Sequence, residues 1–148
     1  MATVRLTKFQ VAERQLIKAI ELFGARDSLC AITLAGAAEE ILGKLLTDKG
    51  EANALDEEIV DRCELYQTVF GRVIDPREFA KLMNSPRNEL KHRLSGEPLE
   101  LNFDEEAVNL IQRAIDNFLK LKPGPNAFFA AFEDDAAAWY RRFSEQVA

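Results

Sequence analysis

Hydrophobic residues recur every three to four positions along most of the chain, which is the spacing of one face of an α-helix. The first such stretch covers about residues 8–23, and Thr7 and Gln10 at its start have the spacing of a capping box. The second covers about residues 29–49 and is apolar on almost every side in its first half, which predicts a central, buried helix. A glycine follows each stretch, as is typical where a helix ends.

The middle of the chain predicts a third and a fourth helix. Residues 56–70 form the third apolar stretch, and the run Asp-Pro-Arg-Glu at 75–78 has the acidic cap and first-turn proline that favour the start of the fourth. Pro86 lies within the fourth stretch, where proline interrupts helical hydrogen bonding. Two arrangements are therefore open: a short new helix that starts at Pro86 with Ser85 as its cap, or one helix bent at Pro86.

Two further helices complete the pattern and define the expected fold. A long amphipathic stretch covers about residues 105–122, and an aromatic-rich stretch covers about residues 127–146, suited either to core packing or to a protein interface. We expect an all-α fold, an up-and-down bundle of five to six helices. The 29–49 and 105–122 helices should pack antiparallel at its centre.

Length and composition indicate a single folded domain. The chain has 148 residues, of which 47% are hydrophobic and 30% charged, and we expect one domain over 1–148 with its core at about 5–122. Cys30 and Cys63 stand apart in the sequence and neither belongs to a Cys-x-x-Cys pair, so we interpret both as reduced core residues of a cytoplasmic protein. We expect no signal peptide and no membrane span.

Charge is distributed unevenly along the chain. The net charge of −6 argues against general nucleic-acid affinity. Residues 72–93, however, contain six cations and three anions, a net charge of +3 that leaves −9 for the rest. The cations are Arg72, Arg77, Lys81, Arg87, Lys91 and Arg93. This segment is therefore the basic part of an acidic chain.

The only histidine, His92, lies in this basic segment. Asn88 is four positions before it, so on a helix the amide can hold the imidazole in one orientation. If a new helix starts at Pro86, Arg87 lies in its first turn, where unpaired N–H groups and the helix dipole favour an anion. Arg87, Asn88 and His92 thus predict a phosphate site with a proton-transfer group beside it.

The pattern Arg87-Asn88-x-x-x-His92 resembles the signature of the HEPN superfamily of small helical domains. In that family, an Arg and a His separated by four to six residues, commonly with a polar residue after the Arg, form the active site of metal-independent ribonucleases. The resemblance implies catalytic roles for these three residues, no cofactor, RNA as substrate, and a homodimer whose two motifs face each other. It also implies a toxin or defence role, with an antitoxin or nucleotidyltransferase as partner.

The chemistry of RNA cleavage assigns a role to each residue of the motif. The ribose 2′-OH attacks its own phosphate, so Arg87 would stabilise the charge on the phosphate oxygens and His92 would act as base or acid. We expect both residues in a solvent-accessible cleft. Three nearby cations, Lys81, Lys91 and Arg93, are candidates for substrate binding.

An acidic residue from the 29–49 helix is the remaining candidate for the site. Helices of this kind in HEPN proteins often present an acidic residue to the motif, and Glu39 or Glu40 could do so. We take Glu40 as a substrate-binding candidate. In the alternative interpretation, Glu40 pairs with Lys44 on the surface and the other glutamate faces solvent.

Other classes of function fit the sequence less well. Glu89 and His92 have the spacing of a di-iron ligand pair, but such sites need two of these pairs and the chain has one histidine. Phosphate-binding glycine loops are absent, and we expect no metal site. One alternative stays open: a non-catalytic HEPN-like helical module that binds a nucleotide, RNA or a partner protein.

Overall fold

A computed structural model describes residues 2–92 and 96–147 of the chain. Within these ranges the protein is all-α, which confirms the predicted helical bundle, and no helix there is both long and apolar enough to cross a bilayer. The six helices are α1 (Lys8–Gly24), α2 (Ser28–Asp48), α3 (Ala54–Phe70), α4 (Pro76–His92), α5 (Phe103–Leu121) and α6 (Ala127–Val147). The capping box at the start of α1 is present, with reciprocal hydrogen bonds between Thr7 and Gln10 of 2.9 and 3.1 Å.

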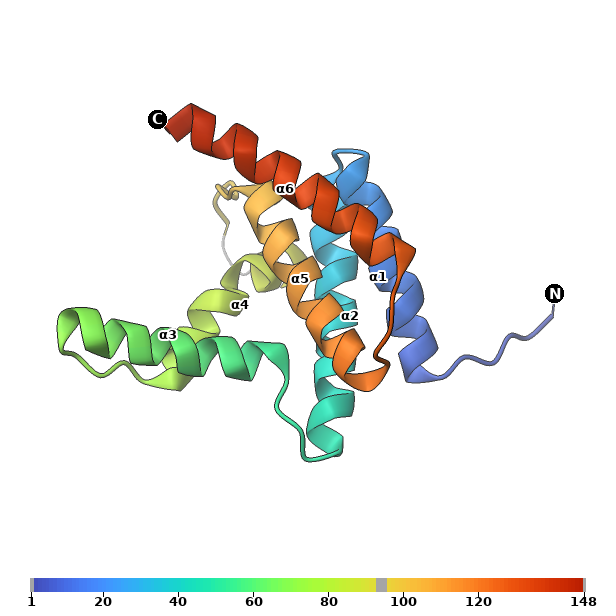
Figure 1. Ribbon diagram of the computed structural model, residues 1–148, viewed down its shortest axis with the longest axis horizontal. Helices are drawn as coiled ribbons and strands as arrows, with labels where there is room; N and C mark the ends of the chain where they lie inside the picture. The colour runs from blue at the N-terminus through green and yellow to red at the C-terminus, as the bar shows by residue number, and fades with distance from the viewer. Residues whose placement is uncertain (1, 93–95, 148) are drawn as a thin grey trace.

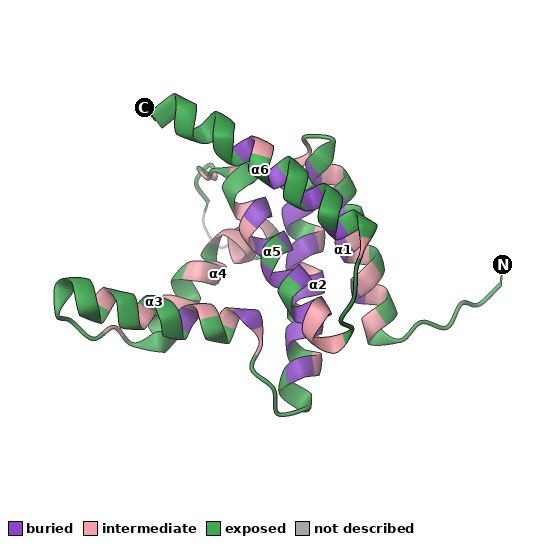
Figure 2. Ribbon diagram, in the orientation of Figure 1, coloured by how far each residue is buried: buried purple, intermediate pink, exposed green. Residues whose placement is uncertain are grey.

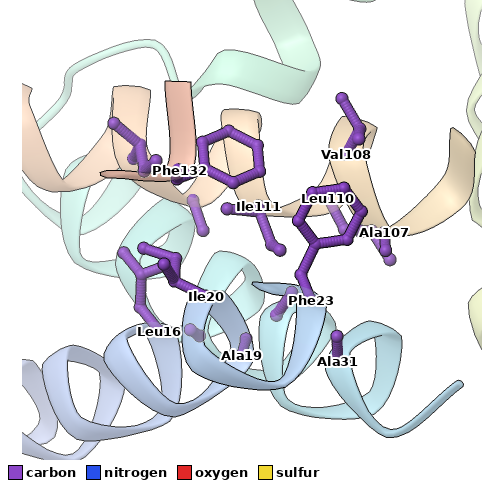
Figure 3. Close-up of a cluster of buried hydrophobic side chains, with 14 of the residues drawn as sticks. Leu16, Ala19, Ile20, Phe23, Ala31, Ala107, Val108, Leu110, Ile111 and Phe132 are labelled. Carbon is purple, nitrogen blue, oxygen red and sulfur yellow. The ribbon is translucent and has the colours of Figure 1, made fainter. Parts of the chain in front are cut away.

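The hydrophobic core lies between α1, α2 and α5, and α6 crosses it on one side (Figure 1). Side chains from α1, α5 and α6 meet there, among them Leu16, Ile111 and Phe132, all of which are almost completely buried (Figure 3). α2 has buried residues through its whole length, so it is the central, buried helix that the sequence predicts. The core therefore forms around α2, and one side of the same helix contributes to the site described below.

α2 and α5 run parallel, so the expected antiparallel pairing of these helices is wrong. Ser28, the first residue of α2, donates a hydrogen bond to Asp104 in the first turn of α5. Further along, Asn117 of α5 donates to the carbonyl oxygen of Glu39 in α2. The direction follows from α3 and α4, which leave the bundle and return the chain to the end where α2 began.

α3 and α4 form a hairpin that projects from the bundle, and we call it the arm (Figure 1). Only Ala54 and Ile59 of α3 are buried, and no residue of α4 is, so the arm contributes little to the core (Figure 2). Val60 and Phe70, two hydrophobic residues of this stretch, are exposed. Gly71 ends α3 in the left-handed conformation, where a residue without Cβ has no steric penalty.

α4 is one helix that continues through Pro86. The arrangement in which Ser85 caps a new helix is therefore wrong, and Arg87 does not lie at a helix N-terminus. Proline removes the hydrogen bond to the carbonyl four residues earlier, here that of Leu82. Leu82 is exposed, so water can satisfy that carbonyl and the helix tolerates the proline.

The burial of side chains bears on two further expectations, one for the aromatic residues of α6 and one for the cysteines. α6 packs one aromatic face on the core through Phe129, Phe132 and Trp139 and leaves its other aromatic side chains exposed. The prediction that both cysteines are core residues is wrong for Cys30, which is exposed on the outer side of α2, whereas Cys63 is half-buried on α3. Both are free thiols, because neither is in a disulfide.

Candidate functional site

Four charged side chains form a series of ion pairs that joins four helices. Nη1 of Arg87 on α4 donates to Oε2 of Glu39 on α2, at 3.2 Å. The other carboxylate oxygen of Glu39 lies 3.6 Å from Nε of Arg113 on α5. Nη1 of Arg113 lies 3.4 Å from Oε2 of Glu58 on α3. We call these four residues the charge chain, and it ties both helices of the arm to the bundle.

The inner members of the charge chain are removed from solvent. The side chain of Glu39 is 5% exposed, that of Arg113 is 8% and that of Arg87 is 17%. Burial raises the pKa of Glu39, while the guanidinium groups of Arg113 and Arg87 oppose this rise. The Nε atoms of both arginines are buried without a hydrogen-bond partner. Buried polar atoms are usually satisfied, and Nε of Arg113 faces the Glu39 carboxylate at 3.6 Å, beyond hydrogen-bond distance.

Arg87 reaches Glu39 by crossing α2 at a glycine. A Cβ atom at position 36 would lie 2.6 Å from Cδ of Arg87 and 3.0 Å from its Cγ, closer than side chains can approach. Gly36 is therefore the residue that allows the aliphatic part of Arg87 to lie against the helix.

Gly36→Ala should separate Arg87 from Glu39 and destabilise the fold. Overpacking costs about 1–3 kcal/mol, of which the better helix propensity of alanine returns about 0.5–1 kcal/mol. Urea unfolding measures the difference. Gly43→Ala is the matched control on the same helix, because its added Cβ would meet its nearest atoms at an ordinary 3.5 Å. Equal effects of the two substitutions would contradict the role given to Gly36.

A cavity of about 480 Å³ lies beside the charge chain, between α2, the last turns of α4 and the start of α1. We call it the α2 cavity. Arg87 and Lys91 line it from α4, Glu40 lines it from α2, and Lys8 lines it from α1. The structure therefore brings together three of the candidate residues, Arg87, Lys91 and Glu40, at one concave surface.

His92 lies on a different side of α4 from Arg87. Residues five positions apart are rotated by about 140° around a helix with 3.6 residues per turn. His92 and Lys81 are exposed, and both follow one side of α4 with Asn88, over about 16 Å at 1.5 Å per residue. Within the described part of the chain, no hydrogen bond joins Asn88 to His92. Arg93 lies outside the described residues.

Glu39, not Glu40, is the acidic residue that contacts the motif. Glu40 is exposed and contributes to the wall of the α2 cavity. The alternative pairing of Glu40 with Lys44 is not present, since Lys44 pairs with Asp48 at 3.3 Å. Helical spacing contained the distinguishing signal, because Glu39 falls in register with the buried Ala35 and Leu42.

Sequence reasoning missed three polar residues around Glu39, of which Arg113 and Asn117 are buried and Glu58 is partly exposed. Arg113 and Glu58 extend the charge chain, and Asn117 is completely buried. Oδ1 of Asn117 accepts from the backbone N–H of Ala54 at 2.7 Å, and its Nδ2 donates to the carbonyl of Glu39 at 3.5 Å. A signal existed, because Arg113 and Asn117 interrupt the apolar face of the α5 sequence one turn apart.

Metal ligands do not gather in the described part of the chain. No group of three or more His, Cys, Asp or Glu side chains there could hold a metal ion. The arrangement offers a fixed guanidinium, a cavity with a basic rim, and an exposed imidazole on the same helix.

Comparison of the chain with protein-family models, with curated proteins and with solved structures found no match in any of the three. The functional assignment therefore depends on the residues and the geometry described above.

Proposed function

We propose that the protein is a metal-independent endoribonuclease of HEPN type, acting in the cytoplasm, that cleaves RNA by attack of the ribose 2′-OH. One observation carries the proposal. Glu39 fixes the guanidinium of Arg87 at the edge of the α2 cavity. Five residues after Arg87, α4 presents the exposed His92. A permanently charged anion-binding group and a proton-transfer group are what this reaction needs.

The reaction balances without a metal ion or a cofactor. The 2′-oxygen forms a bond to phosphorus as its proton passes to a base, and the bond from phosphorus to the 5′-oxygen breaks as that oxygen receives a proton. The products are a 2′,3′-cyclic phosphate and a 5′-OH. Arg87 would stabilise the charge that accumulates on the phosphate oxygens between these states.

A homodimer would supply the second proton-transfer group. One imidazole cannot accept and donate a proton in the same step, and the chain has a single histidine. A two-fold axis near the end of α4 would bring two copies of His92 together. It would also let Arg87 of one copy act with His92 of the other, which removes the need for both side chains to share one side of α4.

RNA would be held by the exposed cations of α4. Lys81 and His92 lie along one side of the helix, and Lys91 lies at the α2 cavity. Cationic side chains neutralise backbone phosphates without reading base sequence, so affinity should weaken as salt is raised. The toxin or defence role, and an antitoxin or nucleotidyltransferase as partner, belong to the same proposal.

The alternative function, a non-catalytic binding module, is favoured by one specific observation. Arg87 is already paired with Glu39 and only 17% exposed, so part of its charge is neutralised before any substrate binds. A structural arginine would make the same contact. The two functions differ in whether covalent products form.

Cleavage of single-stranded RNA in the presence of EDTA tests the proposal directly. Purified protein should produce fragments that end in a 2′,3′-cyclic phosphate and begin with a 5′-OH, detected by electrophoresis and mass spectrometry. DNA of the same sequence is the control, and it should survive because it lacks the 2′-OH. Binding of RNA without any cleavage would favour the binding module instead.

A further inference from the structure

The α2 cavity has the size and the lining of a small-molecule site. Its volume of about 480 Å³ falls in the range of about 300–1,000 Å³ that is usual for ligand pockets. Its lining follows α2 from Ile32 to Asp48, about 24 Å at 1.5 Å per residue, so the cavity is elongated. Apolar side chains form much of the wall, among them Ile41, Leu45 and Leu90.

Cations surround this apolar wall. Lys91 and Lys8 line the cavity, and within the described residues neither takes part in an ion pair. Arg87 also lines the cavity, with Nη1 of its guanidinium paired to Glu39 at 3.2 Å. Asp48 is neutralised by Lys44, which leaves Glu40 as the one lining carboxylate without an ion pair in the described chain. The positive groups thus outnumber the negative ones at the mouth of an apolar cavity.

We propose that the α2 cavity binds a small amphipathic anion, with an elongated apolar body and one carboxylate, sulfonate or phosphate group. The body would lie along Ile41 and Leu45, and the anionic group would meet Lys91 and Arg87, where charge-assisted hydrogen bonds are strong. This site shares Arg87 and Lys91 with the proposed ribonuclease function, but binding of the anion does not depend on RNA cleavage. A phosphodiester backbone is a poorer occupant, because it would place charge along the apolar wall.

Binding of 8-anilinonaphthalene-1-sulfonate, an aromatic sulfonate whose fluorescence rises in apolar sites, tests this inference on the full chain. We expect saturable binding of one dye per chain and displacement of the dye by dodecanoate. N-phenyl-1-naphthylamine has the same apolar body without the sulfonate. It should bind about tenfold more weakly, the loss expected for one charge-assisted hydrogen bond.

Two substitutions separate the apolar wall from the charged rim. Ala37→Phe should fill the cavity and abolish dye binding, and Lys91→Glu should weaken binding by about tenfold or more through loss of the cation. Lys18→Glu, on an exposed part of α1 outside the cavity, is the control and should bind as the wild type does. Circular dichroism checks that each variant is folded. If Ala37→Phe does not fold, Lys91→Glu still tests the inference.

Three results would overturn the inference. If Ala37→Phe binds the dye as tightly as the wild type does, the dye sits elsewhere, such as on the exposed apolar residues of the arm. Equal binding of the neutral naphthylamine would mean that the cavity does not recognise an anion. Displacement of the dye by single-stranded RNA, but not by dodecanoate, would assign the cavity to the nucleic acid.

Discussion

His92→Ala should lower the rate of RNA cleavage by at least about 10²–10⁴-fold, the usual loss when one general acid or base is removed, because the dimer would lose both of its imidazoles. The imidazole is exposed and makes no hydrogen bond or ion pair within the described chain, so its removal should leave the fold intact. Single-turnover cleavage of a labelled oligonucleotide gives the rate, and thermal unfolding gives the stability.

Gln67→Ala is a suitable control, since Gln67 is exposed on α3 and belongs to neither the charge chain nor the α2 cavity. It should cleave RNA at the wild-type rate. A rate for His92→Ala within a factor of two or three of the wild type would remove the imidazole from the reaction and leave the binding module as the function.

Mixing two inactive variants tests the composite site. Arg87→Lys should be inactive as well, because it keeps a positive charge near Glu39 but loses the planar fork that matches phosphate oxygens. In a heterodimer with His92→Ala, one of the two centres would contain an intact Arg87 and an intact His92. Cleavage should recover above the level of either variant alone but stay about 10²–10⁴-fold below the wild-type rate, because the heterodimer holds one imidazole in place of two. No recovery above the single variants would count against a site shared between two copies.

Arg113→Met should lower the free energy of unfolding by about 3–5 kcal/mol at neutral pH. Removal of one partner from a buried ion pair leaves the other charge uncompensated, and this is where the cost arises. Glu39 would keep only Arg87, while Glu58 would still have Arg62 at 2.8 Å. Because the total stability of a domain is about 5–15 kcal/mol, such a loss is easily measured by urea unfolding.

The loss should depend on pH, with a sign set by Glu39. The pKa of Glu39 is raised in the folded chain by burial, so the folded state binds the proton more tightly than the unfolded state does. Its contribution to stability therefore falls as the pH rises from the usual glutamate value of about 4.3 toward the raised pKa. Arg113 is the stronger of the two opposing charges. Without it, the deficit relative to the wild type should be greater at about pH 7 than at about pH 5.

Two further variants isolate the effect of charge. Lys120→Met removes a cation from the same helix, but Lys120 and its partner Glu57 are more exposed, so the loss should be about 0–1 kcal/mol. Glu39→Gln should restore part of the stability when it is added to Arg113→Met, because the uncompensated carboxylate is then gone. If the double variant is as unstable as Arg113→Met alone, the loss came from packing and not from charge.

The helices were predictable because their signals are local. A cap such as that of Thr7 and Gln10 depends on a few adjacent residues, and so does the apolar spacing of each stretch. The observed bounds of α1 and α2 agree with the predicted bounds to within one residue at each end. The relative direction of α2 and α5 could not be predicted in this way. It depends on how far the intervening arm carries the chain, and no short stretch of sequence encodes that distance.

The candidate site was predictable in part for the same reason. Arg87, Asn88 and His92 are close in sequence and could be chosen together, whereas Glu39, Arg113 and Glu58 come from three other helices. The register of Glu39 with the buried positions of α2 distinguishes it from Glu40, but its contact with Arg87 depends on how α4 packs on α2, which no local pattern defines. Pro86 shows the limit of local rules, because α4 continues through a residue that usually ends a helix.

We expect the arm to unfold separately from the bundle. Few of its residues are buried, so it can open at a lower free energy than the bundle, through the local unfolding that hydrogen exchange detects. Arg87 and His92 are on the arm, while Glu39 and Arg113 belong to the bundle. A fluctuation that detaches α4 would therefore break the charge chain while the hydrophobic core stays folded, and the proposed activity should be lost at temperatures where the bundle is still native.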